Sequence, residues 1–160
     1  MRVFKEEQRF NQWWLIVICI LAGIGILLNL ARLLDLSGEI STGKLLGSSL
    51  GLIVCVGIFF VKMHTKIDKS GIKVWFSPFG FTKKYYHWED LENVHTRKYR
   101  PISEFGGWGI RIFRKHKAYN IKGDKGIQLK TKEGKFFLIG TQQTYNADRV
   151  INRYFKNSEE

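Results

Sequence analysis

Cysteine is scarce in this sequence, and the two cysteines present, Cys19 and Cys55, both lie inside apolar runs. The remaining part of the chain, from residue 56 onward, has none. A disulfide framework of the kind found in small secreted domains is therefore not expected, and the pattern agrees with a reducing compartment.

Recognisable catalytic and metal-binding motifs are also missing. No nucleophile elbow, paired-carboxylate signature or H-E-x-x-H sequence occurs. No two of the histidines form an H-x-x-x-H pair; they are His64, His87, His95 and His116. Residues 38–44 match only part of a phosphate-binding loop, because Leu45 stands where the magnesium-binding hydroxyl belongs. We therefore predict a protein that is not an enzyme and that binds no metal and no cofactor.

Charge is absent from two long stretches, Trp13–Ala31 and Leu45–Val61. Because about 20 apolar residues cross a hydrocarbon core, we predict transmembrane helices at 13–33 and 44–62, forming a helical hairpin over 13–63. A buried core helix and a cleavable signal peptide are the alternatives. No small-x-small cleavage site follows Leu30, and acidic residues precede the first run, so an uncleaved anchor is favoured.

Basic residues occur at both ends of this hairpin. Arg2, Lys5 and Arg9 precede it, while Lys62 and Lys66 follow it. Since lysine and arginine are retained in the cytoplasm, we expect both termini to be cytoplasmic, with residues 1–12 as a tail, in a multi-pass protein of the inner (cytoplasmic) membrane. Small residues on the second run, Gly47 and Gly51, would serve either packing within the hairpin or a homo-oligomer contact.

Residues 64–160 change to a two-residue alternation of apolar and polar side chains, which indicates β-strands. About seven short strands are expected, at 72–77, 83–88, 91–99, 108–114, 118–121, 127–130 and 135–140. Ala147, Val150, Ile151, Tyr154 and Phe155 then fall on one face of a helix. The sequence thus predicts an α+β protein whose antiparallel sheet curls into a partly open barrel covered by a C-terminal helix.

Three stretches of this chain resemble small bacterial membrane proteins that carry a two-helix anchor and a bacterial PH-like (pleckstrin-homology-like) domain. They are residues 4–10, 99–111 and 138–143, of which the middle one is the most specific. The resemblance implies a PH-like barrel and a membrane location, but no known activity. The signature residues are expected to be structural, with a ligand loop as the alternative for the glycine-rich part; they are Gly106, Gly107, Trp108, Gly109, Gly140 and Thr141.

The charge of the predicted domain is strongly positive. Residues 62–160 hold 21 lysine or arginine residues against 10 aspartate or glutamate residues, a surplus of 11. Such a surplus can reflect cytoplasmic location alone, or an anion-binding surface. The candidate binding residues are Lys83, Lys84, Arg97, Lys98, Arg100, Arg111, Arg114, Lys115 and Lys117. We expect an interaction module for acidic lipid or a protein partner; the alternative is a membrane-tethered nucleic-acid-binding protein.

Overall fold

A computed structural model describes residues 3–35, 42–113 and 116–155. The chain divides into two compact units. One contains Phe10–Val61, and the other combines Met1–Arg9 with Lys62–Glu160. The second unit is therefore assembled from two segments that flank the first.

The first unit consists of two apolar helices, α1 (Trp13–Asp35) and α2 (Thr42–Phe60). Small residues of α2 lie against α1: Gly51 is next to the Ile26 side chain, and the Cys19 thiol is 3.9 Å from the Cys55 carbonyl oxygen. Gly51 therefore lies where α2 meets α1, whereas a Cβ added at Gly47 would meet no atom within 4 Å.

One of these helices has the length and composition needed to cross a bilayer. Among the described residues, Trp13–Ala31 is the only helical stretch that is both long and apolar enough to cross a bilayer, with a mean hydropathy of 2.6. The apolar part of α2, Ser49–Phe60, is shorter than a full span. The predicted pair of full-length spans is thus met by the first helix alone, because Lys44 and the polar residues around it interrupt the apolar part of α2.

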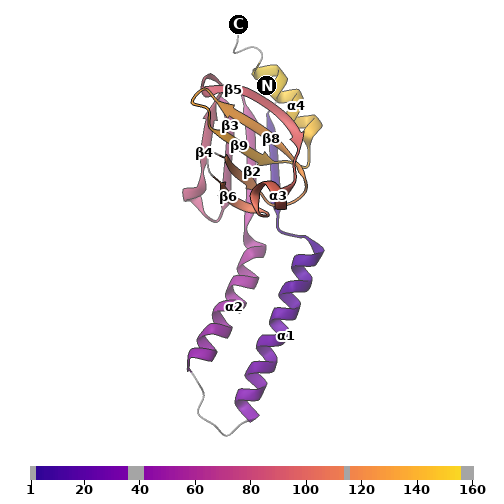
Figure 1. Cartoon of the computed structure of the whole chain (residues 1–160), viewed down its shortest axis with the longest axis vertical. Coiled ribbons are helices and arrows are strands. Elements are labelled where there is room, and N and C mark those ends of the chain that lie inside the picture. The colour runs from indigo at the N-terminus through magenta and orange to yellow at the C-terminus, as the bar shows by residue number, and fades with distance from the viewer. Residues whose placement is uncertain (1–2, 36–41, 114–115, 156–160) are drawn as a thin grey trace. The chain divides into compact units, whose positions relative to one another are not determined.

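The second unit contains two β-sheets and a C-terminal helix (Figure 1). The four-stranded sheet has the order β1 (Phe4–Arg9), β2 (Lys62–Asp68), β3 (Gly71–Ser77), β4 (Lys84–His87). The five-stranded sheet has the order β5 (Leu91–Lys98), β8 (Lys125–Thr131), β9 (Phe136–Gly140), β7 (His116–Asn120), β6 (Gly109–Phe113).

The barrel prediction needs correction in three respects. The described residues form nine strands rather than about seven, the strands belong to two separate open sheets, and β7 pairs with β9 in parallel. β6 is antiparallel to β7, and β8 is antiparallel to β9. β9 lies beside β7 and runs in the same direction as β7. Side-chain alternation marks a strand but does not encode its neighbour, so the sequence could not reveal this parallel pair.

The two sheets pack through their apolar inner faces. The alternation in β1, β2 and β3 sends every second side chain inward, and Tyr86 of β4 contacts Phe137 of β9 with ring centroids 4.7 Å apart. The fully buried aliphatic side chains include Met63, Ile67, Ile72, Val74, Ile127, Leu129, Leu138 and Ile139. Burial of such side chains is the main force that holds the sheets together.

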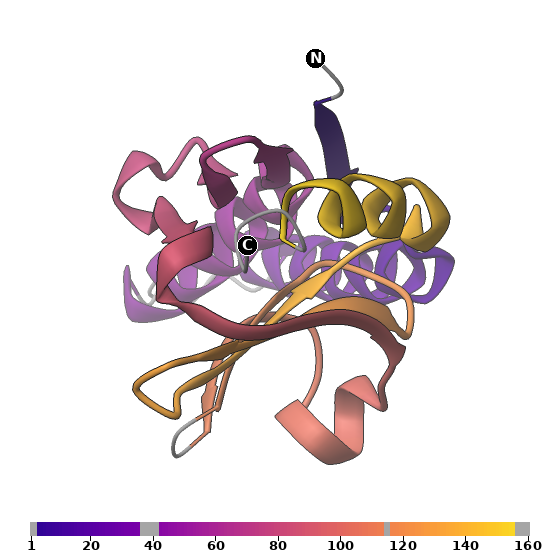
Figure 2. The same cartoon turned by 90° about the horizontal axis from the view of Figure 1, so that it is seen from above.

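The C-terminal helix α4 (Thr144–Tyr154) contacts strands of both sheets and buries Ala147, Val150 and Ile151 against them. Its predicted apolar face is therefore correct, and Gln143 occupies the N-cap position. A short helix α3 (Pro101–Phe105) lies in the β5–β6 connection, away from α4 (Figure 2).

Candidate functional site

The most specific part of the sequence, residues 99–111, forms a corner between β5 and β6. Pro101 begins α3 and Gly106 ends it with a left-handed φ of 70°. Gly107 and Gly109 also have positive φ values, of 118° and 114°. Such angles favour glycine, so these three positions shape the loop.

Buried polar groups hold this corner in place. Asn120 donates from its amide to the Tyr99 hydroxyl at 3.0 Å and accepts from the Gly109 backbone N–H at 2.8 Å. The Trp108 indole N–H donates to the Gly123 carbonyl at 3.0 Å. Burial raises the pKa of Tyr99 to about 12, so its hydroxyl stays protonated. The predicted structural role fits the positions of these residues.

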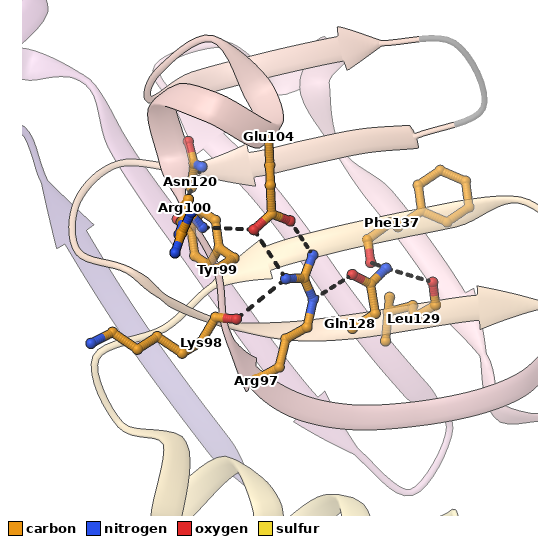
Figure 3. A network of polar contacts seen from close by, with 9 residues as sticks. All are labelled: Arg97, Lys98, Tyr99, Arg100, Glu104, Asn120, Gln128, Leu129 and Phe137. Carbon is orange, nitrogen blue, oxygen red and sulfur yellow. Dashed lines mark hydrogen bonds and ion pairs between the residues drawn. The ribbon is translucent and has the colours of Figure 1, made fainter.

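Two cations of β5, Arg97 and Lys98, form ion pairs with carboxylates, and Figure 3 shows the network around Arg97. Arg97 forms a bidentate ion pair with Glu104, with nitrogen–oxygen distances of 2.7 and 3.3 Å, and its Nε donates to the Gln128 side chain at 3.0 Å. The Arg97 guanidinium, followed by the Arg100 backbone N–H, holds the pKa of Glu104 below its ordinary value. The Arg97 guanidinium therefore joins β5 to α3 and to β8.

A cleft of about 670 Å³ opens beside α3. Its charged lining is balanced, because Lys98 and Arg100 face Glu104 and Asp124, and Lys98 lies 3.1 Å from the Asp124 carboxylate. Balanced charge gives little attraction for an anion. This cleft is consequently a weak candidate for the anionic ligand that the sequence suggested.

The predicted basic residues are distributed over different elements. Lys83 and Lys84 lie at the start of β4, Arg111 and Lys117 are in β6 and β7, and the remaining described members lie around β5 and α3. Arg111 donates to the Trp108 carbonyl at 3.0 Å. Arg114 and Lys115 lie outside the described residues.

The outer face of the four-stranded sheet holds a basic group that the sequence reasoning did not select. We call this the basic face; its strand cations are Lys5, Arg9, Lys62, Lys66 and Lys73. Within the described strands they share the face with the carboxylates of Glu7 and Asp68. The signal was present in the sequence as alternation in 62–68, but it emerges only when β1 is recognised as a strand.

Pairing within the basic face leaves part of its charge uncompensated. Glu7 lies 2.8 Å from Arg9 and 3.4 Å from Lys62, and these cations lower its pKa. Asp68 is 2.7 Å from Lys66. Lys73 extends over the Trp75 ring at 5.7 Å, and the same ring stacks on His64 with centroids 5.0 Å apart.

Metal chemistry finds no support in the geometry of the described residues, where no three histidine, cysteine or acidic side chains gather. The described histidines instead contact neighbouring rings or polar groups, as His116 does by stacking on Phe136 at 5.0 Å. No protein-family model matches the chain, and comparison with curated proteins finds no match.

Proposed function

We propose that this chain is a membrane-anchored, non-catalytic interaction module. In this proposal, residues 10–61 form a two-span hairpin, and the β-rich unit is a PH-like domain at the inner leaflet that binds acidic lipid or a protein partner. Two sheets followed by a C-terminal helix that packs on both of them support the PH-like assignment. The pairing of β1 with β2 carries the anchor part of the argument.

Strand pairing constrains how often the chain can cross a membrane. β1 ends just before α1 and β2 begins just after α2, and the two strands pair from Phe4↔Ile67 to Arg9↔Lys62. Paired strands must lie on the same side, so the intervening segment crosses an even number of times. Because α1 is long enough to span, α2 is the return span; its 19 residues would reach about 28 Å.

The same pairing argues against a cleaved signal peptide. Cleavage after α1 would remove β1 together with its buried side chains, Glu6 and Gln8. Glu6 accepts from Thr141 and from the Gln142 backbone N–H, and Gln8 donates to the Gly140 carbonyl. Leaving these buried partners unpaired would be costly, so the structure favours retention of the first helix as an anchor.

Basic residues on both sides of residues 10–61 support a cytoplasmic position for the domain. Arg9 and Lys62 form the last pair of the β1–β2 ladder, next to the ends of the two helices. Positive residues close to spans are retained in the cytoplasm, where the anionic leaflet attracts them by about 1 kcal/mol each.

Cysteine accessibility in intact cells of an expression host tests this proposal. Cys19 and Cys55 are replaced by alanine, and single cysteines are introduced by Val3→Cys, Gly38→Cys or Tyr145→Cys. Val3 and Tyr145 are exposed, so a membrane-impermeant maleimide can reach them. We expect positions 3 and 145 to react only after permeabilisation, and position 38 to react in intact cells.

Each alternative topology gives a different labelling pattern. Reaction of positions 3 and 145 from opposite sides would exclude the hairpin, and reaction of both from outside would exclude a cytoplasmic domain. A gel-shift assay with single-stranded and duplex DNA at physiological salt tests the nucleic-acid alternative, for which we expect no specific complex.

A further inference from the structure

Three lysines form a continuous row across the basic face. Lys5 pairs with Lys66 across β1 and β2, and Lys66 pairs with Lys73 across β2 and β3. Directly opposite residues in antiparallel strands point to the same side of a sheet, so the three ammonium groups share one surface. Tyr85 of β4 continues this row beyond Lys73.

Like charges placed directly opposite each other destabilise a sheet unless an anion compensates them. The pKa of Lys73 is held below its ordinary value, first by the nearby Lys83 ammonium and then by its surroundings and Lys66. Asp68 lies 2.7 Å from Lys66 and also attracts the Lys73 ammonium, so one carboxylate serves both lysines. Glu7 is engaged with Arg9 and Lys62. The row therefore keeps a local excess of positive charge.

A cleft lies beside two of these lysines. This cleft, of about 530 Å³ on the four-stranded sheet, is lined by Lys5, Lys66, His64 and Trp75 together with Thr65, Glu6 and Glu7. The carboxylate of Glu6 accepts from Thr141 and the Gln142 N–H, and that of Glu7 pairs with Arg9 and Lys62. Lys73 extends over the Trp75 ring, so the indole forms an apolar surface between ammonium groups. An occupant that carries both negative charge and apolar surface fits this combination.

We propose that the row Lys5–Lys66–Lys73, with Trp75 beside it, binds the phosphate of an anionic phospholipid headgroup. Charge complementarity selects an anion, and lysine binds phosphate as a point charge. Lys66 follows the last residue of α2 by six positions in the chain. This step rests on the proposed function, because only a membrane anchor makes lipid headgroups the nearest abundant anions.

The full-length chain in nanodiscs tests this site by lysine acetylation followed with mass spectrometry. One preparation contains phosphatidylcholine alone, and the other contains one third phosphatidylglycerol. Acetylation requires the neutral amine, so a bound phosphate slows it both by covering the amine and by favouring its protonated form. In anionic nanodiscs we expect Lys5, Lys66 and Lys73 to react about threefold to fivefold more slowly, and exposed Lys132 to change much less.

Matched variants separate a defined site from general attraction. Lys73→Gln should remove most of the protection of Lys5 and Lys66, whereas Lys132→Gln should leave it intact. Raising NaCl to 0.5 M should also remove the protection, because salt screens exposed charges. Equal acetylation rates in the two lipid compositions, or protection that survives in Lys73→Gln, would overturn the proposal.

Two further arms identify the source of the anion. Inorganic phosphate added to neutral nanodiscs should not reproduce the protection; if it does, the row is a site for a soluble anion and the lipid assignment is wrong. Failure of this site is distinguishable from failure of the anchor. If the lysines are unprotected but cysteine labelling still places positions 3 and 145 inside, only the proposed lipid site is refuted. If the cysteine labelling itself differs from expectation, the proposed function is refuted.

Discussion

The Thr141 hydroxyl donates a hydrogen bond to the Glu6 carboxylate at 2.5 Å, joining residues 135 positions apart. The other carboxylate oxygen accepts from the Gln142 backbone N–H at 2.8 Å and from the Gln8 amide at 3.2 Å. Glu6 is only 7% exposed. A buried carboxylate with several donors thus fastens the first strand to the segment that follows β9.

Replacing Glu6 with alanine tests the importance of this link. Glu6→Ala leaves the Thr141 hydroxyl and the Gln142 N–H without their acceptor, so we expect a loss of about 2–4 kcal/mol in the free energy of unfolding. Urea unfolding of the full-length chain in detergent measures it. Glu7→Ala is the matched control, because its ion pairs are exposed and should contribute much less to stability. Equal losses for the two variants would contradict this reading.

Two buried threonines should respond in opposite directions to the same substitution. Among the described residues, the Thr65 hydroxyl is buried without a hydrogen-bond partner, whereas that of Thr141 donates to Glu6 and accepts from the Gln143 N–H. Thr65→Val should therefore be neutral or stabilising by up to about 1 kcal/mol, and Thr141→Val should destabilise by about 1–3 kcal/mol. Thermal unfolding of both variants checks the contrast, and a destabilised Thr65→Val would count against it.

The β-rich unit should fold without the helices, provided that β1 is retained. Arg9 and Lys62 form a register pair, so an Asn-Gly turn replacing residues 10–61 would join the strands as a two-residue hairpin. We expect this chain to be monomeric in size-exclusion chromatography, with dispersed amide NMR signals. A chain of residues 62–160 alone should aggregate, because it lacks β1 and β2 then becomes an exposed edge of the sheet. An equally dispersed spectrum from 62–160 would show that β1 is dispensable.

Gly140 is expected to tolerate no larger side chain. A Cβ atom at this position would lie 2.9 Å from the Asn120 Cβ and 3.2 Å from its Cα. Gly140→Ala should therefore cost about 1–3 kcal/mol in the free energy of unfolding and disturb the Asn120–Tyr99 hydrogen bond. Gly80→Ala is the control, since a Cβ there meets no heavy atom within 4 Å. Comparable unfolding midpoints for both variants would refute the steric argument.

The Arg97–Glu104 pair predicts a specific pH dependence. The pKa of Glu104 is lowered from 4.5 in the folded protein, so the unfolded chain takes up a proton more readily. The resulting stability is complete above the ordinary pKa and is lost as pH falls through the folded value. Because the pair is about one third exposed, its contribution is about 1 kcal/mol or less.

Comparison of the wild type with Glu104→Gln at several pH values measures this effect. We expect the difference in thermal midpoint to be constant near neutral pH and to shrink as pH falls below about 4.5. A difference that persists unchanged in acid would assign the effect of Glu104→Gln to lost hydrogen bonds instead, namely those with Arg97 and the Arg100 N–H.

The first strand shows why sequence patterns alone gave an incomplete fold. Residues 4–9 alternate in burial, but the inward positions after Phe4 are Glu6 and Gln8. An apolar–polar alternation is therefore hidden, and the segment resembles a charged tail. Its inward polar groups form hydrogen bonds with Gly140, Thr141 and Gln142, which lie far along the chain.

The candidate site, like the first strand, depends on contacts that the sequence does not reveal. The sequence selected Arg97 because it is basic, yet the tertiary structure commits its guanidinium to Glu104 and Gln128. Lys5, Lys66 and Lys73 were not among the binding residues selected from the sequence, and only strand register places them in one row. Charge counts identify a basic domain, but the partners of each cation depend on contacts between distant segments.

The sequence by itself determined the apolar first helix, the strand-rich basic region and the apolar face of α4, because these follow from local composition and periodicity. Only the tertiary structure decided that β1 belongs to the domain, that β7 and β9 run in parallel, and which lysines share a surface. The physical reason is that strand pairing joins residues up to 63 positions apart, and buried polar groups join residues 135 positions apart; no local pattern records such partners.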